Sequence, residues 1–288
     1  MENVINSEPI SSSGRKLFFG LFIFPLMIAV GMAVLLCTVV LLTREAETPE
    51  SLITAIKTGA PSKRWQKAFE LSNELNQGRG LIRSSGVMNE IIHILNGHEE
   101  YDAKTRSYMA VALTRFDEPE ATEALRATLR VETEAEVELY SLWALGQKQV
   151  REAVPDILPY LDRDEEDIRN MAIYVLGVLG DSRGVQPLSR LLNHEARDIR
   201  WNAALSLARL GNDAGYDVMV KMLDRETLAH YEGLEEGKIE QIMINAVKGL
   251  ALLNHKESLP ILKKIAAEDI SLKVRKVALE ALASAETE

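Results

Sequence analysis

Two stretches of this sequence repeat one another: DIRNMAIYVLGVLGDSRGVQPLSRLL, from Asp167 to Leu192, and DIRWNAALSLARLGNDAGYDVMVKML, from Asp198 to Leu223. They align without a gap at a spacing of 31 residues. A fixed period of this length indicates a solenoid, in which each unit stacks on its neighbours because one unit cannot bury its own apolar face.

The register of these stretches continues in both directions along the chain. Each unit is expected to contain two helices, and the second helix carries one column of residues at position 0 and a second column at position 7. Positions 0, 3, 4, 7 and 11 share one helical face, which predicts the common core. The first column is Arg106, Glu138, Arg169, Arg200, Met243 and Arg275, and the second is Leu113, Leu145, Leu176, Leu207, Leu250 and Leu282.

Glycine and proline mark the expected helix ends. Gly180 and Gly211 follow the last apolar position, where glycine adopts the left-handed backbone of a helix C-cap at low cost. Prolines stand near the start of several first helices, where the missing N–H is not needed: Pro119, Pro155, Pro187 and Pro260. We therefore predict an all-α fold, an α-α superhelix of about six to seven helix pairs over residues 61–288, with a degenerate first unit near Arg64.

The pattern of Asp-Ile-Arg, then Ala, then Leu-Gly, with Gly-Asp and a proline-opened helix, resembles HEAT repeats. Its short period resembles the bacterial class called phycobilisome-lyase HEAT-like repeats, most clearly over residues 137–184. The resemblance covers about residues 60–285. It implies a right-handed superhelix whose second helices line the concave side. It says little about function, because function depends on sites and not on the fold.

Two enzyme families with this fold have features that can be checked in the sequence. Deoxyhypusine hydroxylase binds iron through four His-Glu pairs, whereas this chain has only His98-Glu99 and His194-Glu195, both in expected turns. Bilin lyase subunits share the repeat but have no membrane anchor. The sequence also lacks a Gly-rich phosphate loop, CxxC, HExxH and GxSxG. We therefore expect no catalytic residue, no metal and no cofactor, and we do not expect an enzyme.

Residues 17–43 begin with an uncharged apolar run that predicts a transmembrane anchor helix. The 26 residues from Leu17 to Leu42 exceed the roughly 20 needed to span a bilayer. A cleaved signal peptide has a shorter apolar core and a small-x-small site, and here Arg44 occupies a position that should be small. Residues 1–16 are expected to be a disordered tail, and residues 44–60 a juxtamembrane connector.

Charge gives a weak prediction of topology. Arg15 and Lys16 abut the N-terminal end of the anchor, which favours a single-pass inner-membrane protein with its N-terminus in the cytoplasm and its repeats outside it. Ala29 and Ala33 form a small-xxx-small pair through which anchors of two copies can associate. The net charge of −10 argues against nucleic-acid binding, because it repels phosphate backbones.

An aromatic and apolar strip marks the second helices on the face opposite the core. A solvated face would be polar here, and exposed apolar patches usually mark partner sites. The alternative is that curvature buries these side chains against neighbouring units. The predicted partner-binding residues are Tyr108, Val111, Tyr140, Trp143, Met171, Tyr174, Leu205 and Arg209. The arginines of the first column are interpreted as structural ion pairs with nearby carboxylates, and not as an anion site.

Together these features predict a membrane-anchored, non-catalytic scaffold or adapter. Its concave groove would bind a protein partner, such as a subunit of a membrane complex. One alternative is a lyase-like or metal- or cofactor-handling HEAT-repeat protein. Another is a spacer that self-associates through its anchor. Two insertions, around residues 77–86 and in the acidic segment around residues 224–241, are expected to provide secondary contacts at most.

Overall fold

The computed structural model describes residues 19–43, 48–77 and 84–285. These residues form helices joined by turns, and no β-strand occurs among them. The chain divides into two compact units, Met1–Thr48 and Pro49–Glu288. The all-α fold predicted from the repeat pattern is confirmed.

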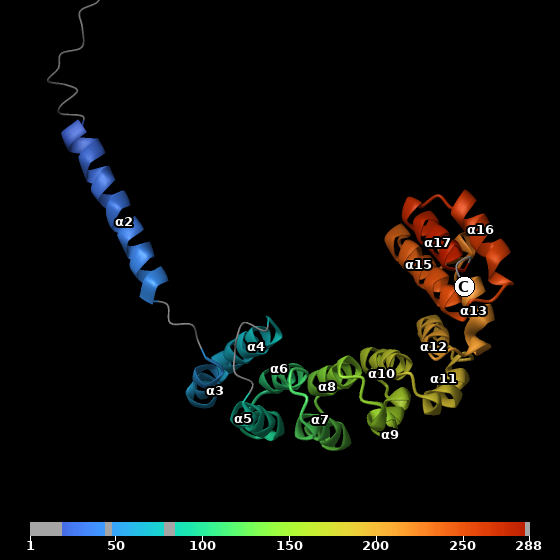
Figure 1. Ribbon diagram of the computed structural model, residues 1–288, viewed down its shortest axis with the longest axis horizontal. Coiled ribbons are helices and arrows are strands. Elements are labelled where there is room, and N and C mark those ends of the chain that lie inside the picture. Colours follow the sequence, from blue (N-terminus) through green and yellow to red (C-terminus); the bar gives the residue numbers. More distant parts are fainter. Residues whose placement is uncertain (1–18, 44–47, 78–83, 286–288) are drawn as a thin grey trace, which may run out of the picture. The chain divides into compact units, whose positions relative to one another are not determined.

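The first unit contains a single long apolar helix, coloured blue in Figure 1. A π-helical turn, η1 (Phe19–Ile23), continues into α2 (Phe24–Thr43). The segment Gly20–Val39 has 20 residues, a mean hydropathy of 2.5 and no buried residue. A helix of that length extends about 30 Å, which is the thickness of a bilayer core. By length and composition it suits a membrane span, although the apolar part of a signal sequence has the same properties. The predicted tail, residues 1–16, lies outside the described residues.

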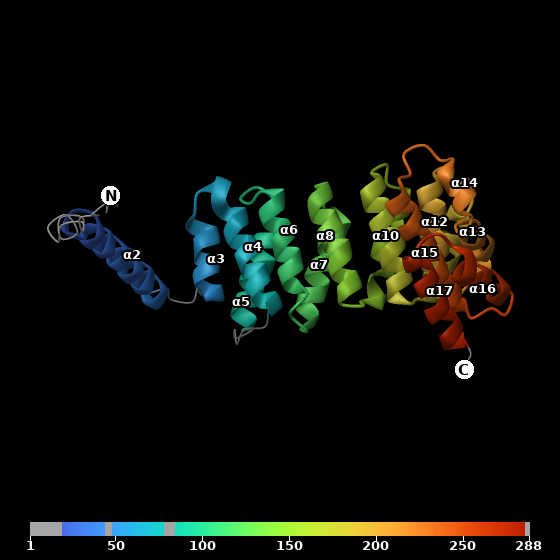
Figure 2. The same ribbon diagram turned by 90° about the horizontal axis from the view of Figure 1, so that it is seen from above.

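The second unit is a row of helix pairs in two layers, and Figures 1 and 2 show it from two directions. Seven helices form the inner layer, on the concave side of the row, and each packs on the next. They are α4 (Pro61–Gln77), α6 (Ala103–Leu113), α8 (Ala135–Gln147), α10 (Glu166–Leu179), α12 (Arg197–Arg209), α15 (Glu236–Leu253) and α17 (Leu272–Ala285).

The outer layer supplies the first helix of each pair and includes several short helices. It consists of α3 (Pro49–Thr58), α5 (Ser85–Asn96), α7 (Pro119–Val131), α9 (Val154–Ile157), α11 (Val185–Leu191), α13 (Tyr216–Lys221) and α16 (Ser258–Glu268). The 3₁₀ turns η2 (Arg151–Ala153), η3 (Leu158–Asp162), η4 (Ser182–Gly184) and η5 (Asp213–Gly215) flank the shortest of these. Seven pairs agree with the predicted six to seven.

The structure moves the start of the repeat unit from residue 61 to Pro49. The segment predicted as a connector, residues 44–60, contains α3, and its Leu52, Ile53 and Ile56 are buried in the core. These three residues follow the spacing of an amphipathic helix, so α3 covers the otherwise open side of α4. The first pair is therefore α3 and α4.

The helix ends and the core columns follow the sequence pattern. Pro119 is the first residue of α7, and Gly180 ends α10 with φ of 64°. Five members of the leucine column, Leu113 to Leu250, are fully buried, and Leu282 in the last helix is half-buried. The inner helices begin three residues before the first column in most units, and seven residues before it in α15.

Glycines allow neighbouring inner helices to approach closely. A Cβ atom on Gly177 of α10 would lie 2.7 Å from the Cβ of Ser206 and 2.8 Å from its Cα, both in α12. A Cβ atom on Gly146 of α8 would lie 3.1 Å from Val175 of α10. Both glycines occupy position 8 of their helices, so this position faces the next helix in the row.

The core of the second unit consists of two clusters. The first extends from Leu52 to Leu207, and the second extends from Ala204 to Ala281. Helix α12 contributes to both clusters, and its half-buried neighbour Leu192 packs against the second. The row is therefore one stack of pairs with two apolar cores that meet in α12.

Candidate partner-binding surface

The predicted partner-binding residues all lie on the inner helices α6, α8, α10 and α12. Tyr174 is 41% exposed, and Arg209 is also exposed. Tyr108, Tyr140, Trp143 and Met171 are half-buried, with part of each side chain packed against the core. Val111 is half-buried as well. Each of these half-buried side chains therefore packs against the core with one part and is exposed on the inner layer with the other.

A row of aromatic rings crosses three inner helices. The rings of Phe69 (α4) and Tyr108 (α6) meet edge to face with centroids 5.3 Å apart. The ring of Tyr108 lies 6.3 Å from that of Tyr140 (α8). Burial, together with Tyr140 and Glu136, raises the pKa of the Tyr108 hydroxyl above its ordinary value, so Tyr108 stays neutral and can donate a hydrogen bond.

Phe69 belongs to this row, although the sequence analysis did not select it. It is 44% exposed and occupies position 5 of α4 when Arg64 is taken as position 0. Val111, Trp143 and Tyr174 occupy the same position in later helices. Extending the register to the degenerate first unit would have found it. We call Phe69, Tyr108, Tyr140 and Tyr174 the aromatic row.

Arg209 and Tyr174 are brought together at the far end of the aromatic row. The Arg209 guanidinium lies 5.2 Å from the centroid of the Tyr174 ring. Burial of the guanidinium by surrounding protein lowers the pKa of Arg209, although the side chain as a whole is exposed. A cation over an aromatic face is stabilised by the ring quadrupole. This pair holds a positive charge beside an exposed ring.

Leu205 is the one predicted partner-binding residue that the structure removes from the surface. It is only 8% exposed, and it belongs to the second core cluster. Gly249 of α15 explains this, because a Cβ atom there would lie 3.1 Å from Leu205. The missing side chain on α15 lets Leu205 pack inward.

Three arginines of the column donate to backbone carbonyls. The predicted carboxylate pair is confirmed for Arg106, whereas Arg200 and Arg275 donate to carbonyls instead. Arg275 Nε donates to the backbone carbonyl of Ala266 at 3.1 Å, and Arg200 Nη1 donates to the backbone carbonyl of His194 at 2.7 Å. Arg106 donates to the carbonyl of Leu95 and also forms a buried ion pair with Glu132. Leu95 and Ala266 lie in the last turns of α5 and α16, where carbonyls have no partner inside the helix, so Arg106 and Arg275 supply one. His194 lies between α11 and α12.

Glu138 stands where other units carry arginine, and the surrounding hydrogen bonds change accordingly. The Tyr160 hydroxyl donates to the carbonyl of Leu129 at 2.6 Å. Arg163 Nη1 donates to Glu138 Oε1 at 2.7 Å, while Oε2 is buried without a hydrogen-bond partner among the described residues. Burial raises the pKa of Glu138 above its ordinary value despite Arg163.

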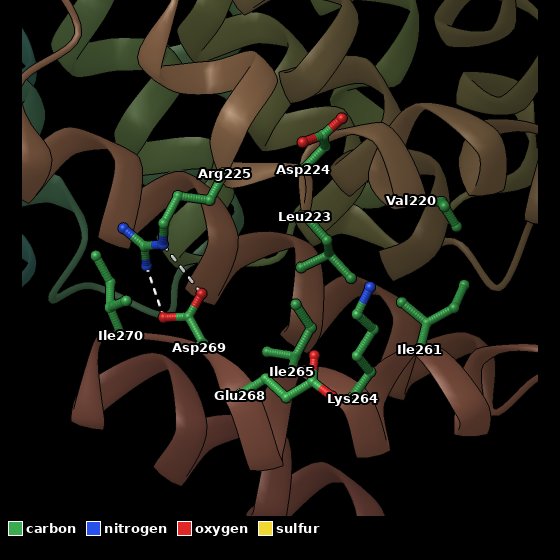
Figure 3. A pocket seen from close by; sticks show the side chains of 10 residues that line it. All are labelled: Val220, Leu223, Asp224, Arg225, Ile261, Lys264, Ile265, Glu268, Asp269 and Ile270. Carbon is green, nitrogen blue, oxygen red and sulfur yellow. Dashed lines mark hydrogen bonds and ion pairs between the residues drawn. The ribbon is translucent and has the colours of Figure 1, made fainter.

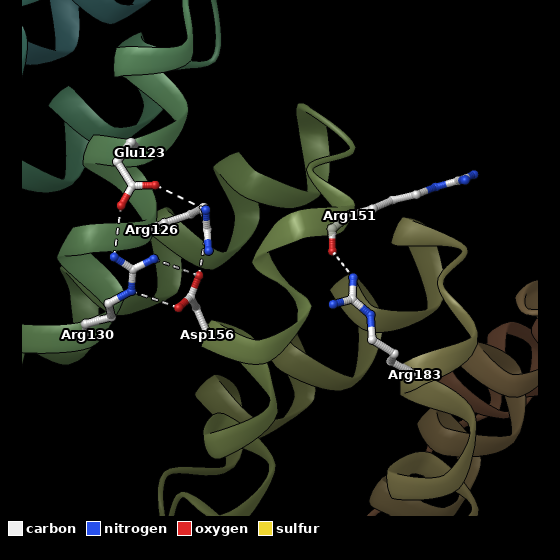
Figure 4. A network of polar contacts seen from close by, with 6 residues as sticks. All are labelled: Glu123, Arg126, Arg130, Arg151, Asp156 and Arg183. Atoms are coloured by element: carbon white, nitrogen blue, oxygen red, sulfur yellow. Dashed lines mark hydrogen bonds and ion pairs between the residues drawn. The ribbon is translucent and has the colours of Figure 1, made fainter.

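Ionic networks on the outer layer join consecutive pairs. Arg126 and Arg130 of α7 both donate to Asp156 of α9, at 2.7 and 2.8 Å, and both also contact Glu123 (Figure 4). Burial alone would raise the pKa of Asp156, but the two arginines hold it below its ordinary value. In the next pair Arg183 donates to the carbonyl of Arg151 at 2.9 Å (Figure 4). These contacts link units and leave little unpaired positive charge for a ligand.

The acidic insertion folds back over the start of α12 through α14 (Arg225–Ala229) and the residues after it. The Arg197 guanidinium lies 4.8 Å from the Tyr231 ring and 5.9 Å from the Trp201 ring. A polar pocket of about 400 Å³ opens beside it. It is lined by Asn170, Arg197, Asp198, Trp201, Asn202, Gly233, Leu234, Lys238, Gln241, Ile242 and Asn245. The insertion therefore extends the inner layer, which the period alone did not predict. The other insertion has residues 78–83 outside the described part.

A second, larger pocket lies on the outer layer between α13, α14 and α16 (Figure 3). Its volume is about 510 Å³, and its apolar floor includes Leu223, Ile261 and Ile265. Arg225 closes one side by donating to both carboxylate oxygens of Asp269, at 3.0 and 2.7 Å. The pocket is open to solvent and is lined by both polar and apolar side chains, and no nucleophilic side chain among its lining residues lies beside a base. Within the described residues no group of three or more His, Cys, Asp or Glu side chains is placed to hold a metal ion.

The family model for HEAT repeats matches residues 129–198 and 154–230. The match covers residues 129–230 in the middle of the solenoid, and the register of inner helices extends on either side of it. No curated protein sequence matches the chain.

Solved structures confirm the solenoid. The structure of the complex of CpcE and CpcF of phycocyanin lyase from Nostoc sp. PCC7120 contains a chain that is 18% identical, with 83% of this chain and 88% of that chain covered and a TM-score of 0.55. A computationally designed armadillo repeat protein for modular peptide recognition is 15% identical, with 83% and 99% covered and a TM-score of 0.42. At these identities the similarity concerns the fold alone. It is supported by the phycocyanin lyase structure, whose TM-score is 0.55.

Proposed function

We propose that this protein is a membrane-anchored, non-catalytic adapter that binds a segment of a protein partner on its inner helices. The partner would be another subunit of a membrane complex. The observation that supports this most is the aromatic row, because Phe69 and Tyr174 remain exposed on the inner layer of a HEAT-repeat solenoid. Tyrosine and other aromatic side chains are favoured anchors in interfaces, since they bury a large area at little entropic cost.

The architecture supports a binding role. Repeat solenoids of the HEAT and armadillo kind generally mediate protein–protein interaction, because each pair contacts only its neighbours and leaves a long inner surface open. In this chain the aromatic row covers α4 to α10 and ends at the Arg209 cation. A partner segment with apolar side chains and an acceptor or carboxylate near one end fits this arrangement.

Anchoring would keep the binding surface close to a bilayer. Five residues, 44–48, lie between the end of α2 and the start of α3. Five residues span at most about 18 Å when fully extended. With α2 in a membrane as a single-pass anchor and the N-terminus in the cytoplasm, the repeats would lie outside the cytoplasm and near the lipid surface, where they would meet other membrane proteins.

The experiment is photo-crosslinking in membranes with the full chain, from position 143, where Trp143 is half-buried on α8. We expect one discrete protein partner, and we expect Phe69→Ala together with Tyr174→Ala to weaken its capture at least tenfold. Val131→Ala is the matched control, since Val131 is 68% exposed on the outer helix α7. Equal capture by both variants would overturn the assignment of the surface. A coloured or metal-loaded preparation of the protein would overturn the non-catalytic part of the proposal and favour the lyase-like or metal-handling alternative.

A further inference from the structure

Helix α17, the last described inner helix, is apolar on two opposite faces. Val274, Ala278 and Ala281 are buried on the face toward the solenoid. On the opposite face Leu272 is 76% exposed and Leu279 is 58% exposed. Lys276 lies on the same face between Leu272 and Leu279, and Ala283 lies on it one helical turn after Leu279. We call Leu272, Lys276, Leu279 and Ala283 the open stripe.

Comparison with the other inner helices shows what the open stripe corresponds to. Leu279 is at position 4, and its five counterparts are fully buried: Ala110, Leu142, Ile173, Ala204 and Val247. Ala283 is at position 8, the position at which Gly146 and Gly177 meet the next inner helix. The open stripe is therefore the face through which each inner helix packs on its successor, and among the described residues α17 has none.

The two ends of the solenoid differ in this respect. At the other end α3 exposes Glu50, Ser51, Thr54 and Lys57, which form a polar surface of the kind that terminal repeats require. At the α17 end, two exposed leucines and a small residue form a close-packing helical surface. A contiguous apolar stripe of this kind marks an interaction site.

The charges beside the open stripe complement a second copy of the same helix. Lys273 and Glu280 flank the stripe on one side, seven residues apart. If two α17 helices pair antiparallel, Leu272 lies opposite Ala283, and each Lys273 lies opposite a Glu280 of the other copy. Charged residues at such flanking positions set the orientation of paired helices.

We propose that the open stripe of α17 binds the open stripe of a second copy of this chain, antiparallel and about a two-fold axis. The interface is isologous, because the same residues contribute from both copies. It covers the face through which each inner helix within the chain packs on its successor. The stem of Lys276 covers Leu279 of the other copy while its ammonium stays at the edge. This interaction is separate from the partner-binding aromatic row and from the anchor helix.

Self-association of the full chain in detergent micelles tests the proposal, with sedimentation measured over a range of protein concentrations. We expect a concentration-dependent dimer, and Leu279→Asp should weaken it at least tenfold. Val131→Asp is the control, since it adds the same charge at an exposed apolar site on α7. An Ala29→Ile, Ala33→Ile background removes association through the anchor. A wild-type chain that stays monomeric at all concentrations overturns the proposal.

Charge reversal tests the orientation. Lys273→Glu alone and Glu280→Lys alone should each reduce self-association, because each variant carries like charges that face one another in the dimer. Mixing the two variants should restore dimers to within about threefold of the wild-type affinity, and high salt should reduce all these differences. Failure of the mixture to associate overturns the antiparallel pairing. Lys273 also contacts Glu240 at 3.2 Å, but such exposed pairs contribute little.

Disulfide formation tests the register. The single cysteine of the sequence, Cys37, is first replaced by Ser. A Leu272→Cys chain mixed with an Ala283→Cys chain should cross-link. The Ala283→Cys chain alone should not cross-link. In its antiparallel dimer the cysteine of one copy lies about 11 helical residues, or about 16 Å, from the cysteine of the other copy, which is beyond the reach of a disulfide. Equal cross-linking of both preparations overturns the register, and the open stripe then serves some other contact.

Discussion

Glu132 and Glu138 are both buried carboxylates, yet their surroundings shift their pKa values in opposite directions. Burial alone would raise the pKa of Glu132, but two backbone N–H groups, of Glu134 and Thr133, and the Arg106 guanidinium hold it below its ordinary value. Burial dominates at Glu138 and raises its pKa, although Arg163 and Tyr160 act against it, and among the described residues its Oε2 accepts no hydrogen bond. The number of donors around each carboxylate decides the direction.

Replacing each glutamate by glutamine should distinguish their contributions to the free energy of unfolding. Glu132→Gln should lower the free energy of unfolding by about 1–3 kcal/mol at neutral pH, because it leaves Arg106 buried without its counter-ion. Glu138→Gln should change it by less than about 1 kcal/mol, since it also removes the burial of a charge. Urea unfolding of residues 49–288 measures both. A larger loss from Glu138→Gln would contradict this account.

The pH dependence has the same origin. The pKa of Glu132 is lower in the folded state than in the unfolded state, so its stabilising contribution is present above the unfolded pKa and is lost as pH falls through the folded pKa. The pKa of Glu138 is higher when folded, so its ionisation opposes folding at neutral pH, and this effect disappears in acid. The stability difference between wild type and Glu132→Gln should therefore shrink as the pH is lowered.

The roles of single residues were the least predictable from the sequence. The arginine column is visible as a pattern, but its acceptors are backbone carbonyls, such as those of Ala266 and His194. Every residue has a carbonyl, so composition cannot identify which one is reached. Nearby carboxylates are conspicuous in the sequence, and they indicate the correct kind of partner for Arg106 but not for Arg200 and Arg275.

At the scale of elements, close helix packing at position 8 gives a sharp prediction. Gly177→Ala should lower the free energy of unfolding by about 1–3 kcal/mol, because the new methyl group would lie against the backbone of Ser206 and α10 would have to move away from α12. Gly237→Ala is the control. It lies in the first turn of α15 with no atom within 4 Å of an added Cβ, and it should be neutral or stabilising. Thermal unfolding of both variants checks this.

The helices themselves follow from periodicity and from their caps, so most of them can be predicted from the sequence. The predictions that the structure corrects have identifiable causes. Leu205 was assigned to the surface because its burial depends on Gly249, which lies across an irregular spacing of the repeat. Phe69 lies in the degenerate first unit, which keeps Arg64 at position 0 and Leu71 at position 7, but the surface columns begin only with the next unit. Helix α3 lies in the predicted connector, where one short helix is compatible with the sequence, but its place in the first pair cannot be predicted because a single short helix shows no repeat of its own.

For the whole molecule, α2 makes a prediction about membrane association. The full chain should sediment with membranes and resist alkaline carbonate, while replacing Ile28 and Leu35 by Arg should release it, at about 2.5–3.5 kcal/mol per charge. The mass of the purified protein distinguishes an anchor from a signal sequence. A chain that begins after residue 43 would show cleavage and contradict the anchor.

The meeting of the two apolar cores in α12 bears on how the chain acquires its structure during synthesis. The first cluster ends at Leu207, while the second cluster needs residues up to Ala281. A ribosome releases the chain from its N-terminus, and domains generally condense in that order. The first half of the solenoid can therefore form before the second half has been translated. It would then serve as a template on which α15 and its successors add one pair at a time.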